Sequence, residues 1–138
     1  MARTIGSIIV GLVAWGVVVT LLNFGLRAAI PGYHAAEASL LFTGAMKAGR
    51  LIEAAIASFA AGMAVRAVAP ASRAAPWVTG LIILALFVPV HIQLWNKFPA
   101  WYHLTFLLSI VPLVWLGATV RLASAGARPR PPNRRLQG

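Results

Sequence analysis

The sequence predicts an all-α integral membrane protein: a bundle of four transmembrane helices, antiparallel and up-down, with both termini in the cytoplasm. Each of three 23-residue stretches without Asp, Glu, Lys or Arg is long enough, as a helix, to cross a hydrocarbon core of about 30 Å. These stretches are Thr4–Leu26, Ala74–Asn96 and Phe98–Val120. A fourth apolar stretch, around Leu51–Val65, is interrupted only near its start, by Arg50 and Glu53. Hydrophobic residues make up 60% of the chain, more than in ordinary soluble domains.

The first helix is predicted at about residues 4–27. It is longer than the 7–15 apolar residues typical of a signal peptide, so we interpret it as a true transmembrane helix. Asn23 lies near its far end, and Pro31-Gly32 closes the segment. Residues 34–46 then predict an outer amphipathic segment, either on the membrane surface or extending the second helix.

The second helix is predicted at about residues 48–68, and its interior consists mainly of small residues. One face carries small side chains four residues apart, and the neighbouring face carries two more. Such spacing lets helix backbones approach closely in lipid, so this helix is expected to be the central one. The helix-packing residues are Ala54, Ala57, Ser58, Ala61 and Gly62.

The third and fourth helices are predicted at about residues 77–95 and 101–122. Only about five residues, NKFPA, join them, which predicts a tight hairpin. Pro89 and Pro112 are expected to kink them. Residues 1–123 would form the transmembrane domain, and residues 124–138 a disordered basic tail rich in Pro and Arg.

The basic residues predict the orientation. With the N-terminus inside, eight of the 12 Lys and Arg residues fall on the inner face and four on the outer face, as the positive-inside rule favours. The outer four are Arg27, Lys47, Arg50 and Lys97. Aromatic and basic residues near the membrane surfaces are expected to anchor the protein to lipid. They are Trp77, Trp95, Lys97, Trp101, Tyr102, Arg128, Arg130, Arg134 and Arg135.

Composition excludes several kinds of chemistry. The chain has no cysteine, which excludes disulfides, thiolate metal sites and Cys nucleophiles. Its only carboxylate side chains are Glu37 and Glu53, too few for most acid–base or two-metal mechanisms. No catalytic residue and no metal site are predicted, and an enzyme is disfavoured. The net charge is +10, and the basic residues that produce it lie at the ends of the apolar segments and in the C-terminal tail. This distribution indicates contact with lipid and not with nucleic acid.

A layer of polar residues is the candidate site. The predicted topology places Asn23, Arg50, Glu53, His91 and His103 at similar depth in the outer leaflet. An ionisable residue such as Glu53 inside a membrane helix is a functional hypothesis by default. Its structural alternatives are an i,i+3 pair with Arg50 and extension of the side chain to the interface.

His91 and His103 lie on adjacent helices. They are candidates for proton relay or for ligating a metal or haem, and the alternative is a pair of imidazoles in the aromatic belt. No cofactor is predicted, and haem bound through the two histidines is a minor alternative.

Two segments carry a resemblance to a known group. Residues 98–118, FPAWYHLTFLLSIVPLVWLGA, and residues 60–68, AAGMAVRAV, resemble uncharacterised small four-helix bacterial inner-membrane proteins. Those proteins have a GG-like motif ahead of a basic turn, and Met63 replaces its second position here. The resemblance implies the four-helix architecture and a bacterial inner (plasma) membrane, and no activity.

Three functions are expected, in decreasing order. The first is a non-catalytic accessory or assembly subunit, docked on a larger membrane complex or on another copy of itself. The second is a small homo-oligomeric transporter or channel that uses the polar layer around Glu53. The third is a haem- or quinone-binding electron-transfer subunit that uses His91 and His103. The expected partners are membrane lipids and other membrane-protein subunits or the protein itself.

Overall fold

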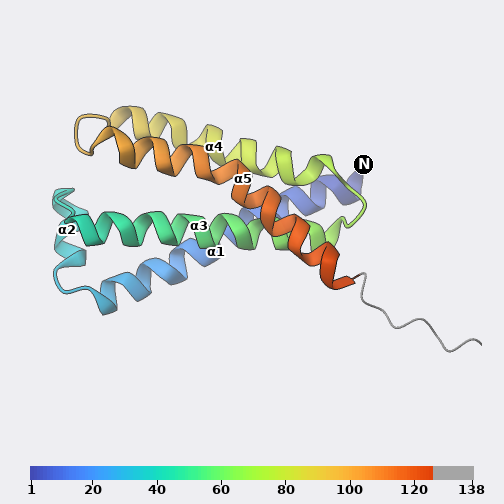
Figure 1. The fold of residues 1–138 in the computed structure, drawn as a ribbon, viewed down its shortest axis with the longest axis horizontal. Coiled ribbons are helices and arrows are strands. Elements are labelled where there is room, and N and C mark those ends of the chain that lie inside the picture. Colours follow the sequence, from blue (N-terminus) through green and yellow to red (C-terminus); the bar gives the residue numbers. More distant parts are fainter. Residues whose placement is uncertain (126–138) are drawn as a thin grey trace, which may run out of the picture.

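The computed structural model describes residues 1–125, which form five helices (Figure 1). They are α1 (Ala2–Ala29), α2 (Tyr33–Ser39), α3 (Gly44–Val68), α4 (Ala74–Gln93) and α5 (Ala100–Ala125). All except α2 are long and apolar enough to cross a membrane. The prediction of an all-α protein with four helices long and apolar enough to span a membrane is therefore confirmed for the described residues. The predicted tail, residues 124–138, lies outside the described residues apart from its first two.

The helix bounds differ from the predicted ones by two to four residues at several ends. The clearest case is α4, which begins at Ala74 and not at Trp77. Pro76 lies in its first turn, where a residue without an N–H loses no intrahelical hydrogen bond. Pro76, which directly precedes the predicted helix, is therefore part of α4. Pro89 also lies inside α4, which continues to Gln93.

Residues 34–46, predicted as an outer amphipathic segment, are divided between two helices. Helix α2 ends where Leu40 adopts a φ of 59°, a left-handed conformation that stops a helix. A new helix begins after Thr43, whose side-chain oxygen accepts a hydrogen bond from the Met46 backbone N–H. Met46 therefore belongs to α3, and α2 is a short separate helix.

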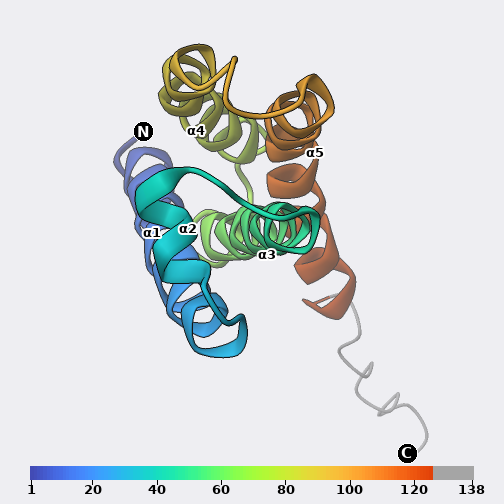
Figure 2. The same ribbon diagram turned by 90° about the vertical axis from the view of Figure 1, so that its left-hand side faces the viewer.

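Helix α3 lies at the centre of the bundle, between α1 and α5 (Figure 2). The five residues predicted to pack helices together are all buried on it. A Cβ atom at Gly62 would overlap the carbonyl oxygen of Val114 on α5, and one at Gly117 would overlap the carbonyl oxygen of Phe59 on α3. The two backbones therefore touch, as the small-residue pattern indicates.

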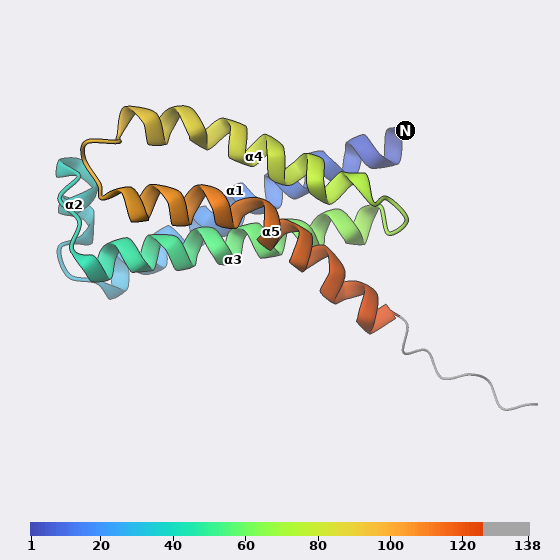
Figure 3. The ribbon, with the colours of Figure 1, turned by 45° about the horizontal axis from the view of Figure 1, so that its top comes forward.

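The bundle has two unlike ends. The polar end holds α2 and the α4–α5 turn, and the closed end holds the N-terminus and the α3–α4 turn (Figure 1). Helix α5 changes direction near its middle, where Pro112 lies in the sequence, on its way to the closed end (Figure 3). At the closed end a Cβ at Gly11 of α1 would crowd Val65 and Thr79, so α1 also packs closely there.

Candidate functional site

Glu37 on α2 holds the polar end together. Its carboxylate accepts hydrogen bonds from Arg27 Nε at 2.7 Å and from Asn23 Nδ2 at 3.0 Å, both on α1. His34 Nδ1 lies 3.6 Å and Arg50 Nη1 4.0 Å from the same carboxylate. Burial raises the pKa of Glu37, but the hydrogen bonds from Arg27 and Asn23 outweigh it, and the pKa lies below its ordinary value. The carboxylate thus ties α1, α2 and α3 together.

Arg50 on α3 is the most connected side chain of the polar end. Its Nη1 donates to the Tyr33 hydroxyl at 3.2 Å and its Nε to the Tyr102 hydroxyl at 3.4 Å. Its guanidinium also lies 5.0 Å from the centre of the Phe42 ring, a cation–π contact. Burial raises the pKa of the Tyr33 phenol, so that this hydroxyl stays neutral and accepts the bond.

Glu53, one helical turn below Arg50, has no such partner. Only 6% of the residue is exposed, and no hydrogen bond or ion pair joins its carboxyl group to another of residues 1–125; its oxygens are not fully buried and face open space. In this structure Arg50 bonds to the two tyrosines and lies 4.0 Å from Glu37, and no hydrogen bond or ion pair joins it to Glu53. A buried carboxyl group without a partner is costly, which makes it the exceptional group of the site.

A cavity of about 320 Å³ lies beside Glu53. Its polar lining is Thr20, Asn23 and Arg27 from α1 and Arg50 and Glu53 from α3. Aromatic residues of three helices form its apolar walls, and they are Trp15, Phe24, Phe87 and Phe106. The cavity therefore combines hydrogen-bond donors, one carboxyl group and aromatic surfaces.

His91 on α4 and His103 on α5 form a second buried polar pair. Their Nδ1 atoms are 2.8 Å apart, so one ring donates and the other accepts. Nε2 of His103 is fully buried without a partner among the described residues. An unpaired N–H there would cost more than an unpaired lone pair, so we assign the proton to Nδ1 of His103, which donates to His91.

The two histidines line a second cavity, of about 220 Å³, on the other side of Arg50. Arg50, Phe87 and Phe106 line both cavities, so the guanidinium stands between them. The structure thus brings Asn23, Arg50 and Glu53 to one cavity and His91 and His103 to its neighbour.

The histidine pair does not fit a haem held between the two rings. The ring nitrogens hydrogen-bond to each other and the ring centroids are 5.0 Å apart, which leaves no room for a macrocycle between two axial imidazoles. No group of three His, Cys, Asp or Glu side chains close enough to hold a metal ion occurs in the described part of the chain.

Most of the residues expected to anchor the protein to lipid are exposed where the structure describes them. Trp77, Trp95, Lys97 and Trp101 lie on the surface. Tyr102 does not: only 4% of it is exposed, and its hydroxyl bonds to Arg50. It is a residue of the polar end and not of the aromatic belt. The four tail arginines lie outside the described residues.

Sequence reasoning missed three polar residues of the site, namely Arg27, Tyr33 and Glu37. Glu37 was the only other carboxylate of the chain, and it lies between a helix that ends in Arg27 and a helix that begins near Arg50. An acidic residue between two basic ones was the sequence signal that could have predicted these contacts of Glu37.

Comparisons with protein-family models, with curated proteins and with solved structures found no match to this chain. The resemblance to small bacterial inner-membrane proteins therefore stays a prediction.

Proposed function

We propose that this protein is a non-catalytic membrane subunit that binds a small amphipathic molecule at its polar end. The observation that carries the proposal is Glu53: a buried, unpartnered carboxyl group that faces a cavity of about 320 Å³ beside Arg50. Pockets that bind small molecules have mostly apolar walls and a few convergent polar groups, as this one does.

The lining of the cavity limits the ligand. Asn23 and Arg50 offer N–H donors, and Glu53 offers either an acceptor or a donor. Trp15, Phe87 and Phe106 offer aromatic faces. A molecule with a compact hydrogen-bonding head and an apolar body suits this lining, and a strongly hydrated ion does not.

The close packing of the closed end supports binding over conduction. There the backbones of α3 and α5 touch at Gly62 and Gly117, and α1 packs against α3 at Gly11. The polar residues of the two cavities all lie toward the other end. A single copy of the described bundle therefore offers a site reached from one side, which suits an accessory subunit.

Transport is the second candidate, and Glu53 favours it as well. An unpartnered acid near an arginine inside the membrane is typical of ion- or proton-coupled sites. This alternative predicts that Glu53→Gln stops flux in vesicles while the thermal stability of the protein stays unchanged. If the wild-type protein binds the small molecule but shows no flux in vesicles, transport is excluded and the accessory role is favoured.

The proposed setting is a bacterial inner membrane, with an antiparallel up-down bundle and both termini in the cytoplasm. The polar end would then face outward. With the N-terminus inside, eight of the 12 Lys and Arg residues of the sequence fall on the cytoplasmic side, which supports this orientation. The proposed partners are the subunits of a larger membrane complex or a second copy of the chain.

Purification from native membranes in a mild detergent tests the proposal. Mass spectrometry of the protein and of its solvent extract should find partner subunits and a bound small molecule, at about one per chain. Glu53→Leu and Arg50→Gln should each lose the small molecule. Lys97→Gln, an exposed change at the same end, is the matched control and should retain it. Identical extracts from all four proteins would contradict the proposal.

A further inference from the structure

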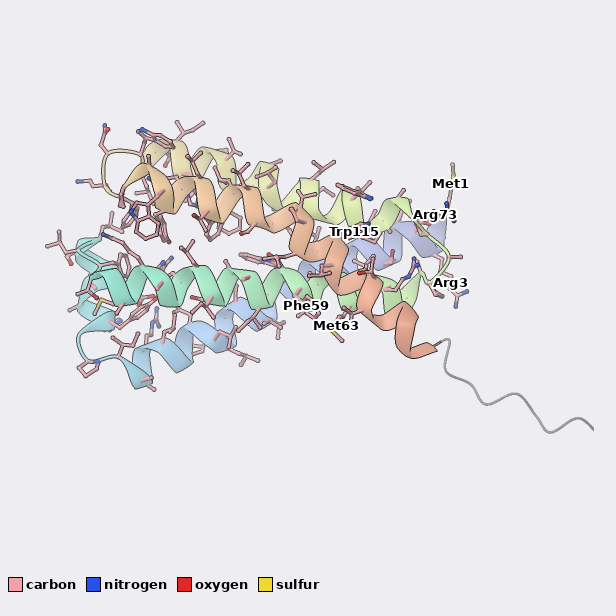
Figure 4. All side chains as sticks on the ribbon, viewed as in Figure 1. Met1, Arg3, Phe59, Met63, Arg73 and Trp115 are labelled. Atoms are coloured by element: carbon pink, nitrogen blue, oxygen red, sulfur yellow. The ribbon has the colours of Figure 1, made fainter. Side chains whose placement is uncertain are left out.

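A third cavity lies at the closed end, far from the site described above. It has a volume of about 270 Å³ and lies between the ends of α3, α4 and α5. Its lining includes Arg66, Arg73, Trp77, Trp115 and Thr119. Figure 4 shows Arg73 and Trp115 in the half of the bundle that holds the N-terminus.

Arg66 is fixed in this cavity and incompletely satisfied. Its Nη1 donates to the carbonyl oxygen of Ser72 at 3.0 Å, which holds the half-buried guanidinium against the α3–α4 turn. Its Nε is fully buried and has no acceptor within residues 1–125. A guanidinium is a rigid fork of five donors that suits the oxygens of a phosphate or carboxylate.

No carboxylate side chain balances these arginines. The only two in the chain, Glu37 and Glu53, are both at the polar end. Arg73 is exposed and directly precedes the first turn of α4, a 20-residue helix. The N-terminus of a helix carries a partial positive charge, so it adds to the potential of the two guanidinium groups. An anion is therefore the favoured occupant.

Two indole rings give the cavity an apolar wall. Trp77 and Trp115 have ring centroids 6.4 Å apart and are 48% and 44% exposed. Tryptophan prefers the boundary between headgroups and hydrocarbon, where one part of the ring contacts apolar chains and the N–H faces polar groups. A charged donor set beside such a wall fits a ligand that carries an anionic group on an apolar body.

We propose that this cavity binds the phosphate group of an anionic membrane lipid. Arg66 and Arg73 contact the phosphate, and Trp77 and Trp115 line the first part of the acyl chains. Free inorganic phosphate shares the same chemistry of recognition, but it does not use the indole wall. This site is independent of the ligand proposed for the polar end.

Native mass spectrometry of the purified full chain tests the proposal, with phosphatidylglycerol and phosphatidylcholine as probes. Wild-type protein should retain one phosphatidylglycerol much longer than phosphatidylcholine. The double variant Arg66→Gln/Arg73→Gln should bind phosphatidylglycerol about tenfold more weakly, because it loses charge-assisted hydrogen bonds. Arg3→Gln is the matched control: it removes one charge at the same end but does not line this cavity.

Three results would overturn the proposal. Equal retention of the two lipids would show that the cavity does not select an anion. An equal loss in Arg3→Gln would show that only the general positive charge acts. Displacement of phosphatidylglycerol by inorganic phosphate at equal concentration would assign the site to a soluble anion.

A fluorescence experiment tests the same proposal without the double variant Arg66→Gln/Arg73→Gln, in case that variant does not fold. Brominated phosphatidylglycerol in mixed vesicles should quench the tryptophan fluorescence of wild-type protein more than brominated phosphatidylcholine does. The variant Trp77→Phe/Trp115→Phe should abolish that difference. A difference that persists in this variant would overturn the proposal.

Discussion

The two ends of the bundle pack in different ways. At the closed end, glycine and alanine bring α3 into backbone contact with α5, and Gly11 brings α1 close to α3. At the polar end, the aromatic side chains Tyr33, Phe42 and Tyr102 stand between the helices around Arg50. Cavities lined by Glu53 and His91 adjoin them. The closed end also has a cavity, beside Arg66, but its helices meet through backbone contacts, whereas the polar end holds the buried Glu53, His91 and His103 of the described residues.

The difference shows how a small membrane bundle tolerates a polar site. In lipid the helices gain little from hiding apolar surface, so close backbone packing must supply much of the association energy. Ala57 and Ala61, both 0% exposed, carry that packing on α3. The polar end can then hold groups that are costly to bury, because the closed end keeps the helices together.

The largest effect is expected from filling the closed end. In Gly62→Ala the new methyl group would overlap the Val114 carbonyl oxygen, so α3 and α5 must separate. Overpacking of this kind costs about 1–3 kcal/mol, and backbone contacts yield less readily than side chains. Thermal unfolding in detergent should show a markedly lower Tm and a broader transition.

The matched control is Gly16→Ala on α1, where a Cβ has no neighbour within 4 Å. This change should leave Tm equal or slightly raised, since alanine favours the helix. If both variants unfold alike, the contrast between the two ends is not one of packing.

The next effect concerns the histidine pair of the polar end. His91→Phe leaves Nδ1 of His103 buried without a partner, which costs about 1–3 kcal/mol. His103→Phe should cost a similar amount, and the double variant should cost less than the sum of the two. A double-mutant cycle on Tm and denaturant midpoint measures this coupling. Additive losses would mean that the two rings do not depend on each other.

The fold was largely predictable, because the spans depend on length and composition. The three charge-free stretches fixed three of the four spans, and the small residues from Ala54 to Gly62 marked α3 as the packing helix. The break between α2 and α3 was not predictable in this way. It depends on the conformation of Leu40 and on the Thr43 cap, and both are local choices that an apolar pattern does not encode.

Only part of the membership of the site was predictable, and its contacts were not. Depth alone placed Asn23, Arg50 and Glu53 in one layer. Which partner Arg50 takes depends on how the helices are rotated, and a single sequence does not give that rotation. The Arg50–Glu53 pair was one alternative, and in the structure Tyr33 and Tyr102 instead accept the hydrogen bonds of the guanidinium. Tyr102 was assigned to the interface as an aromatic residue near a helix end, and that position does not distinguish an aromatic residue that faces lipid from one that faces the bundle.

A smaller effect is expected at Glu37, and it should depend on pH. The pKa of Glu37 is lowered, so the folded state favours the ionised carboxylate more than the unfolded chain does. Its stabilisation is present above the unfolded pKa of about 4.3 and is lost as the pH falls through the lower, folded value. Glu37→Gln should lose about 1 kcal/mol at neutral pH, the size of a partly exposed charged hydrogen-bond network.

Unfolding of wild type and Glu37→Gln from pH 3 to pH 8 measures this dependence. The two proteins should differ at pH 6–8 and converge as the pH falls below about 4. Lys97→Gln is the control, because Lys97 is exposed at the same end and is not a partner of Glu37. A difference that stays constant over the whole range would show that Glu37 acts by packing and not by charge.

The smallest effect is expected at Trp15, which lines the cavity beside Glu53 and also bonds to the packing face of α3. Its Nε1 donates to Ser58 Oγ at 3.1 Å, and Ser58 Oγ donates in turn to the Ala54 carbonyl oxygen. In Trp15→Phe the serine keeps its own donation and loses only an incoming bond. The variant should lose about 0.5–1 kcal/mol of the free energy of unfolding.

Combining Trp15→Phe with Ser58→Ala sharpens the comparison between the ends. If Trp15 stabilises the protein through this hydrogen bond, each single variant loses the same bond. The double variant should then lose less free energy of unfolding than the sum of the two single losses, and the difference is the free energy of that bond. Trp101→Phe, an exposed change, should leave Tm unchanged. A loss of bound ligand in Trp15→Phe at nearly full stability would place Trp15 with the polar end, whereas a large loss of stability would place it with the closed end.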